Sequence, residues 1–448
     1  MRVSYLVVAA VTASLLVGCN NNPSTPPTNA SEAFASRFLS LTHTPPHPPP
    51  QRHRITAAMR ARARAGGWQE VASTVSWRDG PNAPMLMTDG TVMVHDYCTS
   101  NWYSLAPDQS GSYVDGKWTK KASMPKDYAP IYYASAVLAD GKLILNGGEY
   151  NGAGCPFSNT TAGAIYDPVK NAWKAVSGPP GWYGIGDGQS VVLPDGTYMI
   201  GNCCDKYQAL FNEKKLSWIQ SGPYNGKRDV NSEEGWALLP DGHVLVVDVT
   251  DPPHAQTYSE TSNMWTSAGH TPVAVVSGPE IGPETLRPDG TVFVAGATGN
   301  TAIYTPNGGR GTWARGPRFP VFNGQQFDVA DGPSTLLTDG EVMIPASPGF
   351  YQTPAFYFLF DGKKLGIIAG PPNAINDSTY NTGLLMLPTG QVLEVDDTPD
   401  IEVYTPKRNG AAATAPDVTS VSKTLKPANT YTITGRHFNG ASQSNMFG

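Results

Sequence analysis

Short apolar runs alternate with polar turns along most of the chain, and one form of this pattern recurs seven times. The first copy, residues 85–94, reads MLMTDGTVMV: an apolar run, Asp-Gly, and a second apolar run. The Asp-Gly or Thr-Gly pairs of the other copies begin at Asp140, Asp195, Asp241, Asp289, Asp339 and Thr389. Asp-Gly between two strand-like runs favours a β-hairpin with a two-residue type I′ turn, because both central residues of that turn need a positive φ. Each copy therefore predicts one hairpin.

The hairpins recur at intervals of about fifty residues, a period typical of the blades of a β-propeller. After most hairpins a Tyr or Phe in one strand precedes a Trp in the next, as in Tyr166 with Trp173 and Tyr304 with Trp313. We interpret these aromatic residues as packing between outer strands and neighbouring blades. The sequence predicts an all-β fold, with a seven-bladed propeller over residues 67–410.

The two ends of the repeat predict how the ring closes. The seventh copy reaches Tyr404 and is followed by no Trp strand, whereas a spare Trp strand, residues 68–72, precedes the first hairpin. We expect this N-terminal strand to form the outer strand of the last blade, which leaves no sheet edge exposed at the junction.

Composition agrees with this fold and excludes one class of partner. The chain has 448 residues, 47 Gly, 40 Pro and 15% charged residues, which suits a turn-rich β protein. A net charge of −6 argues against a nucleic-acid-binding protein, which normally carries a basic face. Five cysteines allow one or two disulfides in an oxidising compartment. We expect a monomer.

The N-terminus predicts export and a lipid anchor. An apolar run from Tyr5 to Leu16 is too short to span a membrane but suits a signal peptide, and it ends at Cys19 in a sequence that resembles the bacterial lipoprotein box. We predict a signal peptide over residues 1–19, lipidation of Cys19 and an extracytoplasmic, lipid-anchored protein of the bacterial cell envelope. The alternative is an ordinary secretory signal with an incidental cysteine. Residues 20–66, rich in Pro, Asn and Arg, predict a disordered tether in which the arginines could form a short helix.

The last residues depart from the repeat. Residues 411–448 contain two strand-like runs that suggest the start of an immunoglobulin-like β-sandwich. A complete domain of that kind needs about 100 residues. We therefore expect an incomplete segment.

The loops opposite the Asp-Gly turns predict a binding surface at the mouth of the central channel. Carboxylates and aromatic residues alternate there, and our candidate ligand-binding residues are Tyr132, Asp187, Glu233, Glu280, Asp331, Tyr380 and Asn381. Rigid aromatic side chains with polar neighbours suit a sugar, and converging carboxylates suit a cation such as calcium. The alternative is that these acids cap turns and face water.

Cysteines and histidines on the same side offer weaker signals. Cys98 and Cys155 come from neighbouring predicted blades and could form a disulfide. The adjacent pair Cys203 and Cys204 could close on itself or stay reduced. Two histidines, His95 and His254, end inner hairpins and are weak metal candidates, because no spacing forces the three or four close ligands that zinc or copper needs.

Two phrases resemble kelch-type repeats: residues 190–196, SVVLPDG, and residues 144–148, ILNGG. More narrowly, the span 68–448 resembles the galactose oxidase family, in which an immunoglobulin-like domain follows a seven-bladed kelch propeller. The resemblance implies one copper held by two tyrosines and two histidines, with one tyrosine cross-linked to a cysteine.

Most of that copper set is missing here. The family's second tyrosine is followed directly by a histidine, and this chain has Tyr380 followed by Asn381. In the same register Tyr132 stands in place of the cross-linking cysteine, and Asp187 stands in place of its tyrosine partner. A shift by one blade can make Tyr132 the partner, but residues 80–84 offer no cysteine. The second histidine belongs to the C-terminal domain, beyond Gly448.

These observations leave two main hypotheses. The first is a surface-anchored, non-catalytic propeller, without a cofactor, that binds a glycan or a surface protein through its acidic-aromatic face. The alternative is a copper-dependent oxidoreductase of the galactose or glyoxal oxidase class, with Tyr380 as catalytic residue and an unusual ligand set that includes His95 and His254. A purely structural scaffold of the envelope is a third hypothesis.

Overall fold

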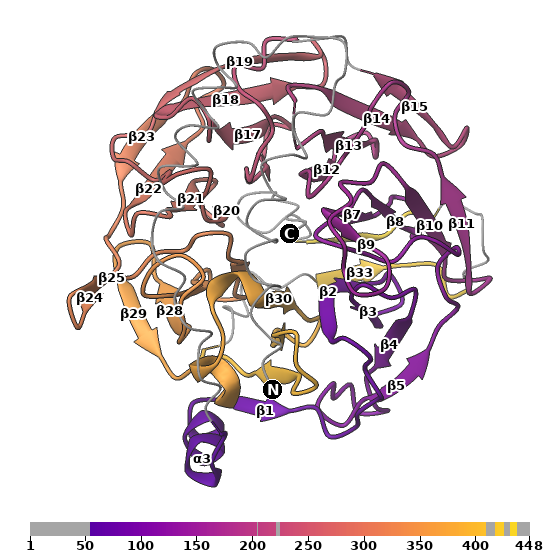
Figure 1. The fold of residues 1–448 in the computed structure, drawn as a ribbon, viewed down its shortest axis with the longest axis vertical. Helices are drawn as coiled ribbons and strands as arrows, with labels where there is room; N and C mark the ends of the chain where they lie inside the picture. The colour runs from indigo at the N-terminus through magenta and orange to yellow at the C-terminus, as the bar shows by residue number, and fades with distance from the viewer. Residues whose placement is uncertain (1–53, 204, 221–224, 409–416, 425–430, 437–448) are drawn as a thin grey trace, which may run out of the picture.

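Seven antiparallel sheets of four strands each make up the body of the protein. The computed structural model describes residues 54–203, 205–220, 225–408, 417–424 and 431–436. The sheets are arranged as blades around a central axis (Figure 1), and the first strands of neighbouring blades contact one another around it. The predicted seven-bladed, all-β propeller is confirmed.

Each blade runs in chain order from its inner to its outer strand. The strands of the first four blades are β2 (Pro81–Leu86), β3 (Val92–Asp96), β4 (Trp102–Ala106) and β5 (Lys117–Lys120); β7 (Ala134–Val137), β8 (Leu143–Asn146), β10 (Gly163–Asp167) and β11 (Ala172–Val176); β12 (Ser190–Val192), β13 (Tyr198–Gly201), β14 (Gln208–Asn212) and β15 (Ser217–Gln220); and β16 (Ala237–Leu238), β17 (Val244–Val247), β18 (His254–Ser259) and β19 (Met264–His270).

The remaining blades follow the same plan, with a closing exception in the seventh. Their strands are β20 (Glu284–Leu286), β21 (Val292–Ala295), β22 (Thr301–Thr305) and β23 (Thr312–Arg315); β26 (Thr335–Leu336), β27 (Val342–Ala346), β28 (Phe356–Phe360) and β29 (Leu365–Ile368); and β30 (Gly383–Met386), β31 (Val392–Val395), β32 (Glu402–Tyr404) and β1 (Trp68–Glu70).

The described residues also form a helix, two 3₁₀ turns and three short strand pairs outside the seven blades. They are helix α3 (Ala57–Ala65), the 3₁₀ turns η2 (Pro372–Ile375) and η3 (Thr379–Asn381), and the strand pairs β6 (Pro130–Ile131) with β9 (Tyr150–Asn151), β24 (Val321–Phe322) with β25 (Gln325–Gln326), and β33 (Asp417–Ser420) with β34 (Thr434–Arg436).

The ring closes as the sequence predicts. Strand β1 pairs antiparallel with β32, so that Trp68 lies opposite Tyr404, and their rings are 5.0 Å apart. The indole nitrogen of Trp68 donates a 2.6 Å hydrogen bond to the carbonyl oxygen of Ala369, which fixes the buried side chain in place. The N-terminal strand therefore completes the seventh blade.

Helix α3 occupies the end of the range 20–66 that the sequence assigns to a tether. Thr56 caps its N-terminus by accepting a hydrogen bond from the Met59 amide, and the helix packs against β1. Arg60 forms ion pairs with Glu70 at 2.7 Å and Asp400 at 3.2 Å. The possible short helix is present; residues 1–53, with the predicted signal peptide and Cys19, lie outside the described residues.

The Asp-Gly hairpins differ from the predicted type I′ geometry. Only the glycines have positive φ, for example 83° at Gly90, whereas Asp89 does not. The Gly90 amide donates to the Met87 carbonyl and the Met87 amide donates to the Thr91 carbonyl, which makes a three-residue loop ending in a left-handed glycine. Asp89 Oδ1 accepts a 2.9 Å hydrogen bond from the Thr91 amide, and this local bond favours the three-residue loop. The type I′ prediction was wrong, although the hairpins are present.

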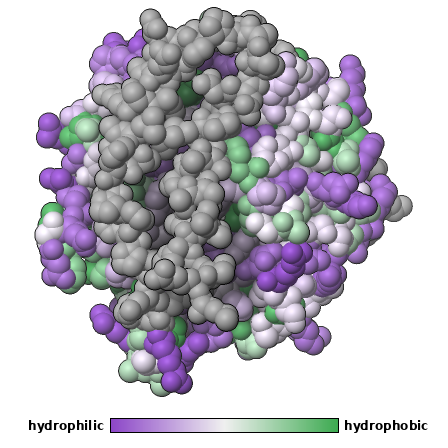
Figure 2. Space-filling model, viewed as in Figure 1, coloured by the Kyte–Doolittle hydropathy of each residue, from purple (hydrophilic) through white to green (hydrophobic). Residues whose placement is uncertain are grey.

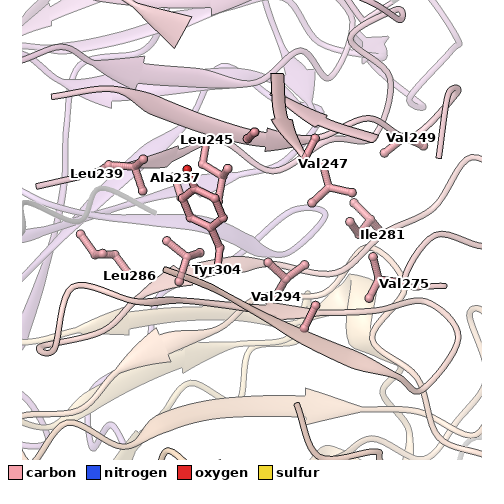
Figure 3. Packing of buried hydrophobic residues seen from close by; sticks show 14 residues of the cluster. Ala237, Leu239, Leu245, Val247, Val249, Val275, Ile281, Leu286, Val294 and Tyr304 are labelled. Atoms are coloured by element: carbon pink, nitrogen blue, oxygen red, sulfur yellow. The ribbon is translucent and has the colours of Figure 1, made fainter. Parts of the chain in front are cut away.

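The cores lie between neighbouring blades. Figure 3 shows Leu245 and Val247 of the fourth blade packed toward Val294 and Tyr304 of the fifth, and all four are at most 1% exposed. Burying such an aliphatic side chain contributes about 1.5–3 kcal/mol. The predicted aromatic pairs pack in this way: Tyr304 and Trp313 lie with ring centroids 5.0 Å apart. Hydrophilic residues gather at the rim of the disc (Figure 2).

The described residues of the C-terminal segment, 417–424 and 431–436, form one strand pair. Strands β33 and β34 pair with each other, and every residue of β33 is exposed. The remaining residues of 411–448 that could extend a sandwich are largely outside the described residues, so the immunoglobulin-like segment stays a prediction. Within the described part of the chain, no helix has the length and apolar character needed to cross a bilayer.

Candidate functional site

A cavity of about 1010 Å³ opens on the side of the ring opposite the Asp-Gly turns. Every one of the seven candidate ligand-binding residues lines it: Tyr132, Asp187, Glu233, Glu280, Asp331, Tyr380 and Asn381. They come from the second to the seventh blades, and the propeller brings them together because each occupies a loop that leads into or out of an inner strand. We call this space the central cavity.

Three carboxylates converge in the central cavity. Oxygen atoms of Glu233, Glu280 and Asp331 lie within 4.8 Å of one another. Glu280 is buried, and its Oε1 accepts a 2.7 Å hydrogen bond from the Tyr351 hydroxyl. Its Oε2 has no hydrogen-bond donor among the described residues. The group therefore concentrates negative charge that the surrounding protein only partly satisfies.

The electrostatics of these acids follow from their enclosure. Burial, and then repulsion from Asp187, raises the pKa of Glu233 well above its usual value. Burial and repulsion from Glu280 do the same for Asp331, although its side chain still contacts the solvent of the cavity. Glu149, on the same wall, has its pKa raised to about 8 by burial and by Asp187. Carboxylates crowded in this way gain stability from a proton, a cation or a hydrogen-bond donor in the ligand.

Tyrosines form the rest of the wall. The rings of Tyr351 and Tyr380 meet edge to face with centroids 5.0 Å apart, and Tyr132 meets Tyr150 in the same way at 6.1 Å. Burial and nearby carboxylates raise the pKa of Tyr150 to about 12 and that of Tyr351 further. These hydroxyls stay protonated at neutral pH, so they can donate hydrogen bonds.

Unusual backbone conformations are concentrated at this wall. Tyr132, Glu233, Asp331, Tyr351 and Asp397 have φ of 52°, 50°, 52°, 55° and 63°. A non-glycine residue at positive φ carries strain, and such residues cluster at binding and active sites. Here the strain turns side chains from loop ends toward a common centre.

Sequence reasoning missed several residues of the wall. Glu149, Tyr150, Tyr351 and Asp397 also line the cavity. Asp397 accepts hydrogen bonds from Asn82 at 2.8 Å and from the predicted residue Asn381 at 3.2 Å, which links the seventh blade to the first. A signal was available for Glu149, Tyr150 and Asp397, because they follow the partner strands β8 and β31 on the cavity side of their hairpins.

The charge of the central cavity is of one sign. Seven carboxylate residues line it, and none of its described lining residues is Lys, Arg or His. An acidic ligand would meet repulsion there, whereas neutral hydroxyl groups or amines would find acceptors.

The predicted disulfide between Cys98 and Cys155 is present, with 5.4 Å between the Cα atoms. It ties the first blade to the loop after β9, and Cys155 lines the cavity. Cys203 is buried, with its Sγ 3.6 Å from Asn159 Oδ1. Cys204 lies outside the described residues, so the state of the adjacent pair stays open.

The structure does not bring the candidate metal-binding histidines together. His95 is fully buried in the first blade, stacked 4.7 Å from Trp102 and hydrogen-bonded to Tyr133, and burial lowers its pKa to about 4. His254 begins β18 in the fourth blade and lies beside Asp251.

A copper site of the galactose oxidase type does not fit these residues. Tyr380 lines the cavity, but the described clusters of three or more close ligands contain no histidine and no cysteine. Two of the described cysteines line the cavity: Cys155 is already bonded to Cys98, and Cys203 is buried, with its Sγ directed to Asn159 Oδ1.

Directly behind the cavity wall, a second acidic group is neutralised from within. Lys227 is completely buried and pairs with Asp229, with Glu234 at 2.7 Å and with Asp248 at 3.7 Å. Burial alone would lower the pKa of Lys227, but the carboxylates raise it overall. We call this group the Lys227 cluster. Its Glu234 is the chain neighbour of Glu233, so adjacent acids serve the core and the cavity.

Comparisons with known proteins show the fold. No family model matches the sequence, and no curated protein matches it. Among solved structures, a fungal alcohol oxidase of the AA5 family, in complex with copper, is similar with a TM-score of 0.59 and 15% identity over 83% of this chain and 84% of that one. A streptogramin B lyase has a TM-score of 0.54 and 11% identity over 75% of this chain and 97% of that one.

A third similar structure is virginiamycin B lyase from Staphylococcus aureus, with a TM-score of 0.55 and 11% identity over 76% of this chain and 99% of that one. At such identities the likeness shows a propeller resembling those of the oxidase and the lyases. Function has to be argued from the site itself.

Proposed function

We propose that this protein is a non-catalytic propeller that binds a glycan without acidic groups in its central cavity. The observation that carries the proposal is the composition of the wall: carboxylates and tyrosines converge from all seven blades, and no described basic residue lines the space. Sugar hydroxyls donate hydrogen bonds to carboxylates, and sugar rings pack on aromatic side chains. Ligand sites combine an apolar or aromatic wall with a few oriented polar groups in this manner.

The size and shape of the cavity favour a glycan over a protein partner. A volume of about 1010 Å³ is at the upper end of the range for small-molecule sites, and it suits an oligosaccharide. A protein surface would need a broad contact area rather than a concave space. The carboxylates of Glu233 and Asp331 offer hydrogen-bond acceptors, and the Tyr351 and Tyr380 pair, which is joined to the same acidic group through Glu280, offers a ring platform.

The N-terminal sequence adds a location to the proposal. A lipid on Cys19 would hold the protein at the outer side of a bacterial membrane, with residues 20–53 as a spacer between the anchor and helix α3. Incorporation of labelled palmitate into the wild type and its loss in Cys19→Ser would support the anchor. Equal labelling of both proteins would contradict it.

A glycan array followed by calorimetry tests the binding function. The array carries neutral, amine-bearing and acidic glycans, and we expect binding to members of the first two classes. In calorimetry with the best array ligand, Tyr380→Ala should weaken binding at least tenfold, because it removes one face of the aromatic pair. Tyr183→Ala is the matched control, since Tyr183 is 88% exposed and outside the cavity lining.

Two results would overturn the proposal. One is the absence of binding across the array. The other is that the Tyr380→Ala variant binds the array ligand as tightly as the Tyr183→Ala variant does. Binding to a surface protein in a pull-down, lost in Tyr380→Ala, would support a protein partner instead.

A further inference from the structure

A third acidic group lies deep in the seventh blade, where the ring closes. Oxygen atoms of Asp377, Glu394 and Asp396 lie within 4.8 Å of one another, and all three side chains are at most 3% exposed. Glu394 and Asp396 belong to β31 and its end, while Asp377 follows η2. Glu402, 0% exposed, lies opposite Glu394 on β32. We call these four residues the seam cluster.

Several oxygens of the seam cluster lack donors. Asp377 Oδ2, Glu394 Oε2 and both oxygens of Glu402 have no hydrogen-bond donor among the described residues. The donors that are present are neutral: the Tyr357 hydroxyl bonds Glu394 at 3.0 Å, and the Asn373 amide bonds Asp377 at 3.2 Å and Asp396 at 2.5 Å. A buried, unsatisfied carboxylate oxygen costs free energy.

No described basic side chain neutralises the seam cluster. The nearest arginine of helix α3, Arg60, is engaged by Glu70 and Asp400. Arg60 and Arg64 line a small cavity with Glu402, yet the described part of the chain contains no ion pair between them and Glu402. The largest charge interactions on Asp377 come from other carboxylates.

The Lys227 cluster is an equivalent group of buried acids in the same fold, and there the chain supplies a positive charge. Asp248 follows β17 in the fourth blade as Asp396 follows β31 in the seventh, and each joins two further buried acids. In the fourth blade the chain places the Lys227 ammonium among them. In the seventh blade no ion pair from the described residues neutralises these acids, so they must hold protons or be neutralised by a bound cation.

We propose that the seam cluster binds one Ca²⁺ ion. The ligand atoms are carboxylate oxygens, with the Tyr357 and Thr398 hydroxyls beside them, and this set of oxygens selects a hard cation over zinc or copper. Two oxygens bound to one Ca²⁺ at 2.3–2.6 Å lie no more than about 5 Å apart, and the three carboxylates satisfy this condition. Mg²⁺ retains several waters, for which this buried group has little room.

The ion would brace two loops that reach the central cavity. One runs from Asp377 through η3 and carries Tyr380 and Asn381; the other turns after Asp396 and carries Asp397. Both loops meet at the hydrogen bond between Asn381 and Asp397. The Ca²⁺ site is thus a structural site that positions cavity residues, and it does not depend on what ligand the cavity binds.

Metal analysis and thermal unfolding of the full-length protein test the proposal. After treatment with EDTA and return of CaCl₂, the wild type should hold Ca²⁺ after dialysis, and its Tm should rise by about 5 °C. Asp377→Asn should lose both the Ca²⁺ of the seam cluster and the rise in Tm. Glu233→Gln with Asp331→Asn removes the cavity acids and should keep both, which assigns the ion to the seam.

Glu234→Gln is the matched control for removal of a buried acid. It should lower stability because it unpairs Lys227, yet leave the response to CaCl₂ intact. The proposal is overturned if CaCl₂ does not change the Tm of the wild type. It is also overturned if Asp377→Asn is as stable as the EDTA-treated wild type and still shows the full calcium response. The comparison of the EDTA-treated wild type with and without CaCl₂ tests the proposal even if a variant does not fold.

Discussion

The Lys227 cluster and the central cavity contain the same kind of acidic group in two different settings. In the Lys227 cluster the carboxylates are dry, and the chain supplies its own ammonium group. In the central cavity Glu233, Glu280 and Asp331 converge as closely, but only Glu280 is buried, and no described basic side chain lines the space. In the fourth blade the chain neutralises its buried acids, whereas in the central cavity it leaves acidic groups available where a ligand can enter. This difference is the best argument that the cavity is a binding site.

The largest expected effect is in the Lys227 cluster. Lys227→Met removes the buried ammonium group that pairs with Asp229, Glu234 and Asp248 and leaves their charge largely uncompensated. We expect a loss of about 3–5 kcal/mol in the free energy of unfolding, measured by urea denaturation. Lys142→Met, at an exposed ion pair with Asp140, is the control and should change stability by less than about 1 kcal/mol. If both substitutions lowered the free energy of unfolding equally, the Lys227 cluster would contribute no more to stability than a surface ion pair, which would contradict this account.

The second effect concerns the covalent link at the cavity wall. Cys98→Ser with Cys155→Ser removes the disulfide that holds the loop after β9. We expect a loss of about 2–4 kcal/mol of stability, because the unfolded chain regains conformational freedom. Affinity for the array ligand should fall as well, since Cys155 lines the cavity. Calorimetry on the folded variant checks this, and unchanged affinity would show that the wall does not need the link.

The third effect has the opposite sign. Glu233→Gln with Asp331→Asn relieves repulsion between crowded acids, so stability should rise by about 1 kcal/mol while ligand affinity falls at least tenfold. Thermal unfolding and calorimetry on the same protein give both values. A fall in stability would mean that these carboxylates support the fold, as those around Lys227 do.

The smallest effect is a dependence of stability on pH. Burial raises the pKa of Glu149 to about 8, above its usual value of 4.5. Between these two values the folded state holds a proton that the unfolded chain has lost, so stability falls as pH rises from about 4.5 to about 8 and then levels. Glu149→Gln should make this decline shallower in urea titrations at several pH values. An unchanged slope would place the proton on another carboxylate.

The fold was predictable because it repeats. Seven hairpins at a regular interval gave the number of blades, and the displaced Trp68 gave the closure. The prediction of the turn type was wrong, because Asp-Gly is compatible with two loop geometries. The choice between them depends on a side-chain hydrogen bond, such as the one that Asp89 accepts from the Thr91 amide. A pattern of residue types does not contain that information.

The candidate site was predictable in part for the same reason. Glu233 and Asp331 were found because each precedes an inner strand at a fixed place in the repeat. Tyr351 was missed because it lies in a long loop whose path follows no repeat. Glu233 and Glu234 both line the cavity, but Glu234 pairs with the buried Lys227, whereas Glu233, with a φ of 50°, converges with Glu280 and Asp331. Neighbouring acids look alike in a sequence, and the backbone decides which of them faces solvent.

The central claim is that the central cavity holds a neutral or amine-bearing glycan, and a crystal structure with the strongest array ligand tests it most directly. The account predicts density for a sugar ring within van der Waals distance of Tyr380, with ring hydroxyls on the carboxylates of Glu280 or Asp331. Sugar density confined to the Asp-Gly turns or to the outer strands, with the cavity holding only solvent, would contradict it.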